Sequence, residues 1–386
     1  METYNIMNKR SIIVEYEFHY GFLLLMIKSL NFRGYDVDVY CTRNFLAYCK
    51  IKKIDKKKIN FICEDSVAYG TYRAILDSKN VEIFLHFSVQ AYKYATFIRL
   101  LKPKAKYNIL YTPRFSNWHN QYIRFSLNKK NIIENYFNIF RYFIKKNYDF
   151  YIVHSAQMAN DIFAKTNYYP IVLPYTCREY IKYEDIQKNK DSNKLRITIL
   201  GSVDEMRRDY LSIFNSKLIS NYNLSDIEFE LAGVPNGSDY SSNTTSDNYF
   251  NLLKTELKKI EKKTGCSVIT YDKRLDETQY IKSIKTADLL LMPLNISHYP
   301  KGSWSAGLAE SIEHDKRILI PKGYDIPEGY PNDYIIYDCT KNLIEKLQDI
   351  KTNKSVCLLS DQETMNRKNS YELKNISERF FNALYS

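Results

Sequence analysis

The sequence predicts an α/β protein with two domains, each built on a doubly wound parallel sheet. In the second half, short β-branched or apolar runs alternate with longer helical segments, which is typical of consecutive β-α units. A polar segment at residues 183–193 interrupts this alternation and has the composition of a linker. The same alternation recurs, less regularly, before the linker. A chain of 386 residues is long enough for two such domains.

The second half has the clearer pattern. The run LRITIL at Leu195–Leu200 ends at Gly201 and precedes a helical stretch, so it opens a β-α unit. The runs at Ala287–Met292 and Arg317–Ile320 are strands rich in apolar residues, as expected for strands buried on both faces. Further strands are expected at Ile227–Ala232, Ser267–Tyr271 and Tyr334–Tyr337, and helices at Arg207–Leu218, Tyr249–Lys263, Thr278–Lys285, Ser305–His314 and Lys341–Ile350.

The first half contains similar runs. Their order again favours a parallel sheet with helices between the strands. Strands are expected at Ser11–Val14, Tyr35–Tyr40, Asn60–Cys63, Ile83–His86, Tyr107–Tyr111 and Phe150–Val153, and helices at Gly21–Leu30, Gln90–Leu101 and Asn131–Lys146.

Composition excludes several classes of protein. With 45% hydrophobic and 26% charged residues, the chain is neither disordered nor a coiled coil. No apolar run reaches the ~20 residues of a membrane-spanning helix. The apolar run Phe22–Ile27 follows Glu15 and Glu17 rather than basic residues, so it is not a secretion signal. The seven cysteines have neither metal-site nor disulfide-scaffold spacing, which predicts free thiols and a cytoplasmic protein.

The positive charge lies in the first half. Residues 1–190 carry a formal charge of +14, whereas residues 191–386 carry −2. An anionic membrane, a phosphorylated substrate and a nucleic acid are the candidate partners of such a surface. The segment Asn128–Tyr148 has basic residues at its ends and apolar and aromatic residues between them. This pattern suits a helix on an anionic bilayer and equally a buried helix with basic ends.

Residues 286–321 form the strongest candidate site. A buried strand ends at Pro293, and the segment Gly302–Gly307 (GSWSAG) then leads into a helix that carries Glu310. Small residues at a helix start let backbone N–H groups approach an anion, and the helix dipole favours negative charge there. A diphosphate therefore fits this place, with Glu310 one turn further on for a ribose diol. The alternative is an ordinary capped helix start.

This patch resembles the donor-nucleotide segment of the retaining family 4 glycosyltransferases, which have the GT-B fold. Ala287–Pro293 match the family's strand, and Gly302–Glu310 match its loop and helix, which in the family contain a Glu-x7-Glu pair. Asp315–Ile320 match the turn and strand that follow. A second stretch, Ile199–Tyr210, resembles the family's strand-Gly-Arg-x4-Lys-Gly turn.

The resemblance implies two Rossmann-like domains that face a central cleft. Residues 1–185 would form the acceptor-side domain, and residues 194–365 would form the domain that binds the nucleotide sugar. Residues 366–386 would form a C-terminal helix that packs back on the first domain.

The resemblance also implies roles for residues of the second domain. Glu310 falls on the second Glu, which holds the nucleotide ribose, whereas Gly302 replaces the first Glu, leaving Lys301 as a candidate for sugar contact. Arg207 falls on the Lys that clamps the diphosphate, with Arg208 beside it as the alternative, although a solvated helix face would also carry two arginines. The remaining donor-binding candidates are Gly21, Gly201, Ser202, Asp272, Lys273, Ser303, Trp304, Ser305, Ala306 and Gly307.

The first half resembles the family in layout. Gly21 stands where the family has a Gly-rich loop under the donor sugar, and His86 ends a predicted strand as the family's strand-His does. Arg114 and His119 follow the strand Tyr107–Tyr111, near the place of the family's catalytic Thr-x-His-Asp. The resemblance therefore makes His86, Arg114 and His119 the catalytic candidates.

The sequence thus favours a glycosyltransferase of the hexosyltransferase type, with a nucleoside diphosphate sugar as co-substrate. The resemblance implies retention at the anomeric carbon and no cofactor, because cationic side chains and a helix N-terminus take the place of a metal. It also implies a glycan or lipid-linked acceptor in the synthesis of a bacterial surface polysaccharide, lipopolysaccharide or capsule. The basic first half would then associate with the inner face of an anionic membrane.

Two alternatives remain open. One is a nucleotide-sugar 2-epimerase of the same fold, which would need a carboxylate cluster in the cleft. The other is a non-enzymatic nucleic-acid-binding or scaffold protein, which the sequence disfavours because it contains no recognised nucleic-acid-binding module.

Overall fold

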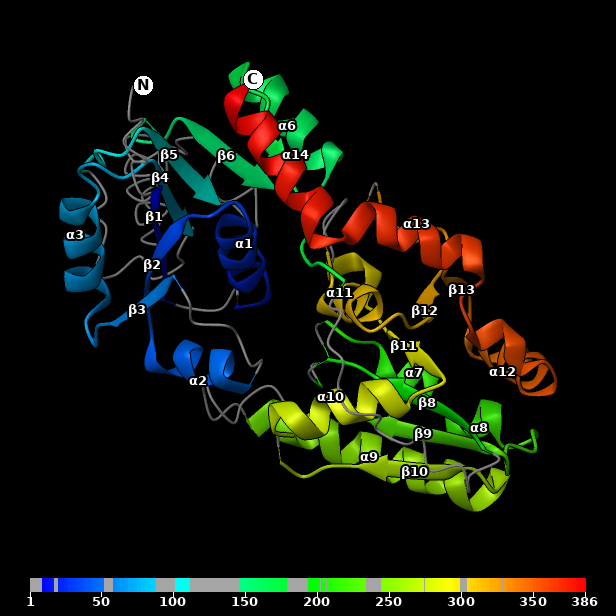
Figure 1. Cartoon of the computed structure of the whole chain (residues 1–386). Helices are drawn as coiled ribbons and strands as arrows, with labels where there is room; N and C mark the ends of the chain where they lie inside the picture. The colour runs from blue at the N-terminus through cyan, green and yellow to red at the C-terminus, as the bar shows by residue number, and fades with distance from the viewer. Residues whose placement is uncertain are drawn as a thin grey trace, which may run out of the picture. The chain divides into compact units, whose positions relative to one another are not determined.

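The computed structural model describes residues 9–16, 20–51, 58–87, 101–111, 146–178, 194–201, 203, 205, 207–233, 244–273, 275–298, 304–327 and 329–386. The chain divides into two compact units (Figure 1). Unit 1 comprises Met1–Thr176 and Leu373–Ser386, and unit 2 comprises Cys177–Glu372. Each unit contains a parallel sheet whose strands are joined by helical connections, which confirms the predicted α/β class.

Unit 1 is built on a seven-stranded sheet in the order β3-β2-β1-β4-β5-β6-β7. Every neighbouring pair of its strands is parallel. The strands are β1 (Arg10–Glu15), β2 (Asp36–Cys41), β3 (Ile59–Cys63), β4 (Ile83–Phe87), β5 (Tyr107–Tyr111), β6 (Phe150–Val153) and β7 (Ile171–Val172). The helices are α1 (Tyr20–Phe32), α2 (Arg43–Ile51), α3 (Val67–Asp77), α6 (Ala156–Thr166) and α14 (Leu373–Tyr385).

The C-terminal helix α14 belongs to unit 1 although it follows unit 2 in the sequence. Its Ser377 hydroxyl donates to the backbone carbonyl of Ser29 on α1, at 3.2 Å. Near its end, Tyr385 shares a 2.8 Å hydrogen bond with the hydroxyl of Tyr35 and donates to Glu82. These contacts confirm that the C-terminal helix packs back on the first domain.

Unit 2 is built on a six-stranded sheet in the order β10-β9-β8-β11-β12-β13, again parallel throughout. The strands are β8 (Leu195–Ile199), β9 (Ile227–Leu231), β10 (Ser267–Thr270), β11 (Leu289–Leu291), β12 (Ile318–Pro321) and β13 (Ile335–Tyr337). The helices are α7 (Tyr210–Ile213), α8 (Ser216–Ile219), α9 (Thr244–Thr264), α10 (Glu277–Thr286), α11 (Ala306–Glu313), α12 (Thr340–Thr352) and α13 (Asp361–Tyr371), with 3-10 turns η2 (Ile296–His298) and η3 (Lys354–Cys357).

The order of the strands in unit 2 reverses between β8 and β11. From β8 the chain adds β9 and β10 on one side, and it then returns to add β11, β12 and β13 on the other. The segments that leave β8 and β11 therefore emerge from neighbouring strands at the carboxyl edge of the sheet. Ligands of open α/β sheets bind at such a switch point.

The predicted helix at residues 207–218 is wrong in its first part. Arg208 forms an isolated antiparallel bridge with Leu294, and the first helical turns begin only at Tyr210 and Ser216. The reason is pairing with a distant segment, because the Arg207 carbonyl accepts from the Asn295 amide at 3.1 Å.

Other helices were not predicted, namely α2, α3 and α6. The predicted helix at 131–146 lies almost entirely outside the described residues, as does the one at 90–101.

All seven cysteines are free. Among the described helices, none has the length and apolar composition that crossing a bilayer requires.

Candidate functional site

Two segments run side by side at the carboxyl edge of the unit 2 sheet. The Asp209 amide donates to the Pro293 carbonyl at 2.9 Å, next to the bridge between Arg208 and Leu294. One segment follows β8 and the other follows β11, so the pairing lies at the switch point of the sheet. The structure thus brings the predicted arginine pair to the edge where a ligand is expected.

Arg208 is the more unusual of the two arginines. It is only 4% exposed, whereas Arg207 lies exposed at the surface. Its Nε and Nη1 atoms are buried and find no hydrogen-bond partner among the described residues. An isolated buried cation is costly, so groups of this kind are normally paired. Among the described residues, the guanidinium of Arg208 therefore keeps two buried donor nitrogens without an acceptor.

Gly201 makes room for this guanidinium. Its φ is +98°, a backbone conformation that residues with a side chain rarely adopt. A Cβ at Gly201 would lie 2.3 Å from Nη2 of Arg208 and 2.9 Å from its Cζ. Glycine is therefore required here for two reasons, the turn after β8 and the close approach of Arg208.

The N-terminus of α11 offers a second set of donors at the same edge. Ser305 is the N-cap residue, but its hydroxyl makes no capping hydrogen bond, is buried and has no partner among the described residues. A Cβ at Gly307 would lie 2.8 Å from Sδ of Met292, so this glycine lets α11 pack closely against the end of β11. Ala306 is the first residue of the helix and lies exposed. The N–H groups of Ala306 and Gly307, which precede the first intrahelical bonds, and the Ser305 hydroxyl suit an anionic ligand.

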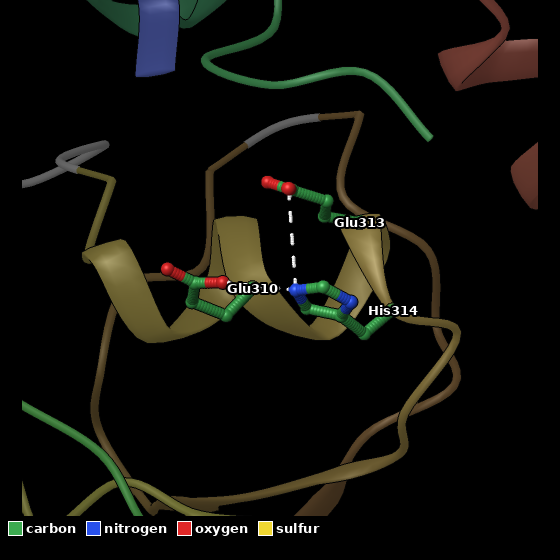
Figure 2. Close-up of side chains that lie close together, drawn as sticks. All are labelled: Glu310, Glu313 and His314. Atoms are coloured by element: carbon green, nitrogen blue, oxygen red, sulfur yellow. Dashed lines mark ion pairs between the residues drawn. The ribbon is translucent and has the colours of Figure 1, made fainter. Parts of the chain in front are cut away.

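Glu310 lies one turn into α11. Its side chain is 23% exposed, and its Oε2 lies 3.4 Å from Nε2 of His314 (Figure 2). Glu313, on the same helix, brings a second carboxylate to 4.0 Å from the same nitrogen. Glu310 therefore presents a partly exposed carboxylate, held beside a histidine, at the position predicted to bind a ribose.

The segment Tyr271–Lys273 is held in place by a buried carboxylate. Glu230 on β9 accepts hydrogen bonds from Tyr271 at 2.7 Å and from Ser283 at 2.6 Å, and it pairs with Arg196 at 3.0 Å. Burial acts to raise the pKa of Glu230, but the hydrogen bonds and the charge of Arg196 outweigh it and hold the pKa below its usual range. Beyond Tyr271, Asp272 pairs with Lys254 at 2.8 Å, and both Asp272 and Lys273 are exposed.

Trp304 precedes the N-cap of α11 and is partly buried. Its ring makes edge-to-face contacts with Tyr330 and Tyr371, with centroids 5.9 and 6.4 Å away. It packs against the hydrophobic core beneath α11, so it supports the entry to the helix.

In unit 1, the described candidates lie in different environments. His86 is 1% exposed within β4, and its Nδ1 shares a hydrogen bond with the Tyr148 hydroxyl. Gly21, in the first turn of α1, is exposed, and an added Cβ would only touch the ring of Tyr175 at 4.0 Å. Its φ is not positive, so the backbone does not require glycine there. The catalytic role of His86 stays a prediction.

Five of the sequence candidates lie outside the described residues: Ser202, Lys301, Ser303, Arg114 and His119. Their roles stay predictions. Of the described candidates, Gly201, Arg208, Ser305 and Gly307 gather at the switch point of unit 2. Sequence reasoning missed Glu313 and His314, although the spacing Glu-x-x-Glu-His on a predicted helix places all three side chains on one face.

Comparisons by sequence and by structure give different results. By sequence, the chain matches no protein-family model and no curated protein. By structure, it is similar to HepE (Alr3699) from Anabaena in complex with UDP and glucose, with a TM-score of 0.64, 9% identity, and coverage of 98% of this chain and 99% of that one.

Two further solved structures are similar. The lipopolysaccharide outer core galactosyltransferase WaaB has a TM-score of 0.53 and 15% identity, and the match covers 98% of this chain and 99% of WaaB. A proposed UDP-N-acetylglucosamine 2-epimerase from Listeria monocytogenes has a TM-score of 0.54 and 13% identity, with 98% and 96% covered. With two parallel-sheet units and these neighbours, the chain has the GT-B fold.

Proposed function

We propose that the protein is a glycosyltransferase that moves a hexosyl group from a nucleoside diphosphate sugar to an acceptor hydroxyl. The observation that carries this proposal is the buried guanidinium of Arg208, which lies over Gly201 at the switch point, with no partner for two of its nitrogens among the described residues. A diphosphate supplies the missing charge and the missing acceptors. UDP is the nucleotide to test first, because the similar HepE structure contains UDP.

The proposed roles of the site residues follow from where negative charge develops during sugar transfer. When the bond between the anomeric carbon and the diphosphate oxygen breaks, negative charge accumulates on the leaving diphosphate. Arg208 and the N-terminus of α11 would stabilise that charge, because fixed donors and cations in a water-poor site need no reorganisation. Glu310 would accept hydrogen bonds from the ribose hydroxyls. The acceptor oxygen forms the new bond to the anomeric carbon and passes its proton to the leaving diphosphate.

Two finer features belong to the same proposal. Retention at the anomeric carbon is implied by the resemblance to family 4, and transfer to a bacterial surface glycan is consistent with the similarity to WaaB. His86, Arg114 and His119 remain the candidate catalytic groups for the acceptor side.

Binding of nucleotides tests the proposal directly. A thermal-shift series with UDP, GDP, ADP and UDP-sugars, in buffer containing a metal chelator, should single out one nucleotide. At 100 times its dissociation constant, such a ligand stabilises a protein by about 2.7 kcal/mol. Glu310→Gln should weaken binding of that nucleotide roughly tenfold, because a charge-assisted bond to the ribose becomes a neutral one. Glu313→Gln, on the same helix, is the matched control and should bind normally. No stabilisation by any nucleotide would contradict the proposal.

A 2-epimerase is the second candidate, because a proposed epimerase is among the similar structures. The two activities differ in what they need. An epimerase converts a UDP-N-acetyl sugar without an acceptor, whereas a transferase requires an acceptor hydroxyl. Formation of a 2-epimer from the sugar nucleotide alone would therefore favour the epimerase.

We also propose that the basic first half brings the enzyme to anionic lipid. Sedimentation with phosphatidylserine vesicles should occur at low salt and weaken with added salt, because the Debye length shortens. Replacing Lys129 and Lys130 by Gln should reduce binding, whereas the same change at Lys262 and Lys263 in the last turn of α9 should not. Equal binding to neutral vesicles would contradict a role for charge.

A further inference from the structure

Three side chains with metal-binding atoms meet at the end of α11. Glu310, Glu313 and His314 stand at positions i, i+3 and i+4, which places them on one face of the helix. Their donor atoms all lie within 4.8 Å of one another. Figure 2 shows that the imidazole lies beside Glu310 and below Glu313, with its Nε2 near both carboxylates. They form the only such cluster in the part of the chain that the structure describes.

The histidine is the informative member of this cluster. Its side chain is only 3% exposed, and its Nε2 has no hydrogen-bond partner among the described residues. The distance from Nε2 to Glu310 Oε2, 3.4 Å, is longer than a normal N–H···O hydrogen bond of about 2.7–3.2 Å. It matches the separation of about 3.3–3.4 Å between two ligands bonded at ~2.05 Å to one tetrahedral ion.

We propose that Glu310, Glu313 and His314 form a binding site for a borderline divalent cation of the Zn²⁺ class. One imidazole nitrogen with two carboxylate oxygens is a ligand set that Zn²⁺ accepts, whereas Mg²⁺ prefers oxygen ligands alone. The negative end of the helix dipole also favours a cation near the last turn of α11. Three protein ligands leave a fourth position for water or another ligand.

The site would couple the metal to the donor nucleotide. Glu310 is also the proposed ribose ligand, so a bound cation and a ribose diol would compete for the same carboxylate. This consequence rests on the proposed function, whereas metal binding does not. The cation would not stabilise the leaving diphosphate, because Arg208 and the start of α11 would do so.

Metal titration of the full-length protein, stripped with a chelator and free of nucleotide, tests the proposal. Competition with a chromophoric chelator should show one Zn²⁺ site, and Co²⁺ should give the visible absorption of a four-coordinate ion. His314→Gln and Glu313→Gln should each weaken metal binding at least tenfold. Glu345→Gln, a carboxylate on α12 that pairs with Lys341, is the control and should change nothing. Excess Mg²⁺ should not displace Zn²⁺.

Three results would overturn the metal site: no stoichiometric binding, equal binding by the His314 and Glu313 variants, or a thiolate-to-Co²⁺ charge-transfer band that assigns the metal to cysteine. The coupling has a separate test. Zn²⁺ should weaken the binding of uridine, a probe without phosphates that could chelate the metal. If Zn²⁺ binds and uridine binding is unchanged, the metal site stands and the ribose assignment of Glu310 fails.

Discussion

Arg208→Met is expected to remove most of the affinity for nucleoside diphosphates without destabilising the ligand-free protein. A charge-assisted hydrogen bond contributes about 1.5–3 kcal/mol, so the dissociation constant should rise roughly ten- to hundredfold. Stability should stay the same or increase, because two buried nitrogens of Arg208 have no partner in the described part of the chain, and methionine fills a similar volume without a charge to desolvate.

The control lies one residue away. Arg207→Met removes the same charge from an exposed side chain and should change nucleotide affinity by less than twofold. Isothermal titration and thermal unfolding of both variants separate binding from folding. If Arg207→Met lost affinity and Arg208→Met did not, the assignment of the diphosphate site would be wrong.

Arg367→Met is expected to cause the largest loss of stability. Arg367 on α13 is fully buried and binds Asp333 through two nitrogens, one of them at 2.8 Å. It also donates to the carbonyl of Ser311, in the last turn of α11, and to that of Lys316, just beyond the helix. Removing the arginine leaves the Asp333 carboxylate buried without its cation, which costs about 3–5 kcal/mol. The melting temperature should fall by about 6–20 °C.

Two further variants check the cause of that loss. Lys368→Met changes the neighbouring, half-exposed cation and should have little effect. Arg367→Met combined with Asp333→Leu should recover part of the stability, because no unpaired charge then remains in the core. A double variant as unstable as the single one would show that the ion pair is not the source of the stabilisation.

The strands could be predicted from the sequence because their signal is local. Runs such as LRITIL and ADLLLM consist mainly of β-branched or apolar residues, as strands of a buried parallel sheet do, and both contain a strand. The alternation of strands and helices in the sequence does not by itself fix the order of the strands in the sheet. That order, and with it the switch point between β8 and β11, is seen only in the folded structure.

Helix α3 could not be predicted as easily, because it carries a glycine at its centre. Gly70 lowers helix propensity, but a Cβ there would lie 1.9 Å from the Tyr16 hydroxyl, so packing requires the glycine. Ser66, which caps the helix through the Tyr69 amide, was the available signal for its start.

In the candidate site, the sequence points to the segment but does not distinguish its two arginines. Arg207 and Arg208 are chemically equivalent in the sequence, and the resemblance favoured Arg207. The structure distinguishes them because the segment is extended where it pairs with Leu294, and adjacent side chains of an extended chain point in opposite directions. That pairing joins residues that lie more than eighty positions apart, so no local sequence pattern predicts it.

The return of α14 to unit 1 has a consequence for synthesis. The helix emerges from the ribosome only after the roughly 200 residues of unit 2, which takes roughly 10–40 s at ordinary rates of translation. During that interval, Ser29 and Tyr35 lack the partners that Ser377 and Tyr385 later provide. Unit 2, being continuous in sequence, can complete its folding first, although it is made second. The N-terminal unit therefore lacks its last helix until translation is almost complete.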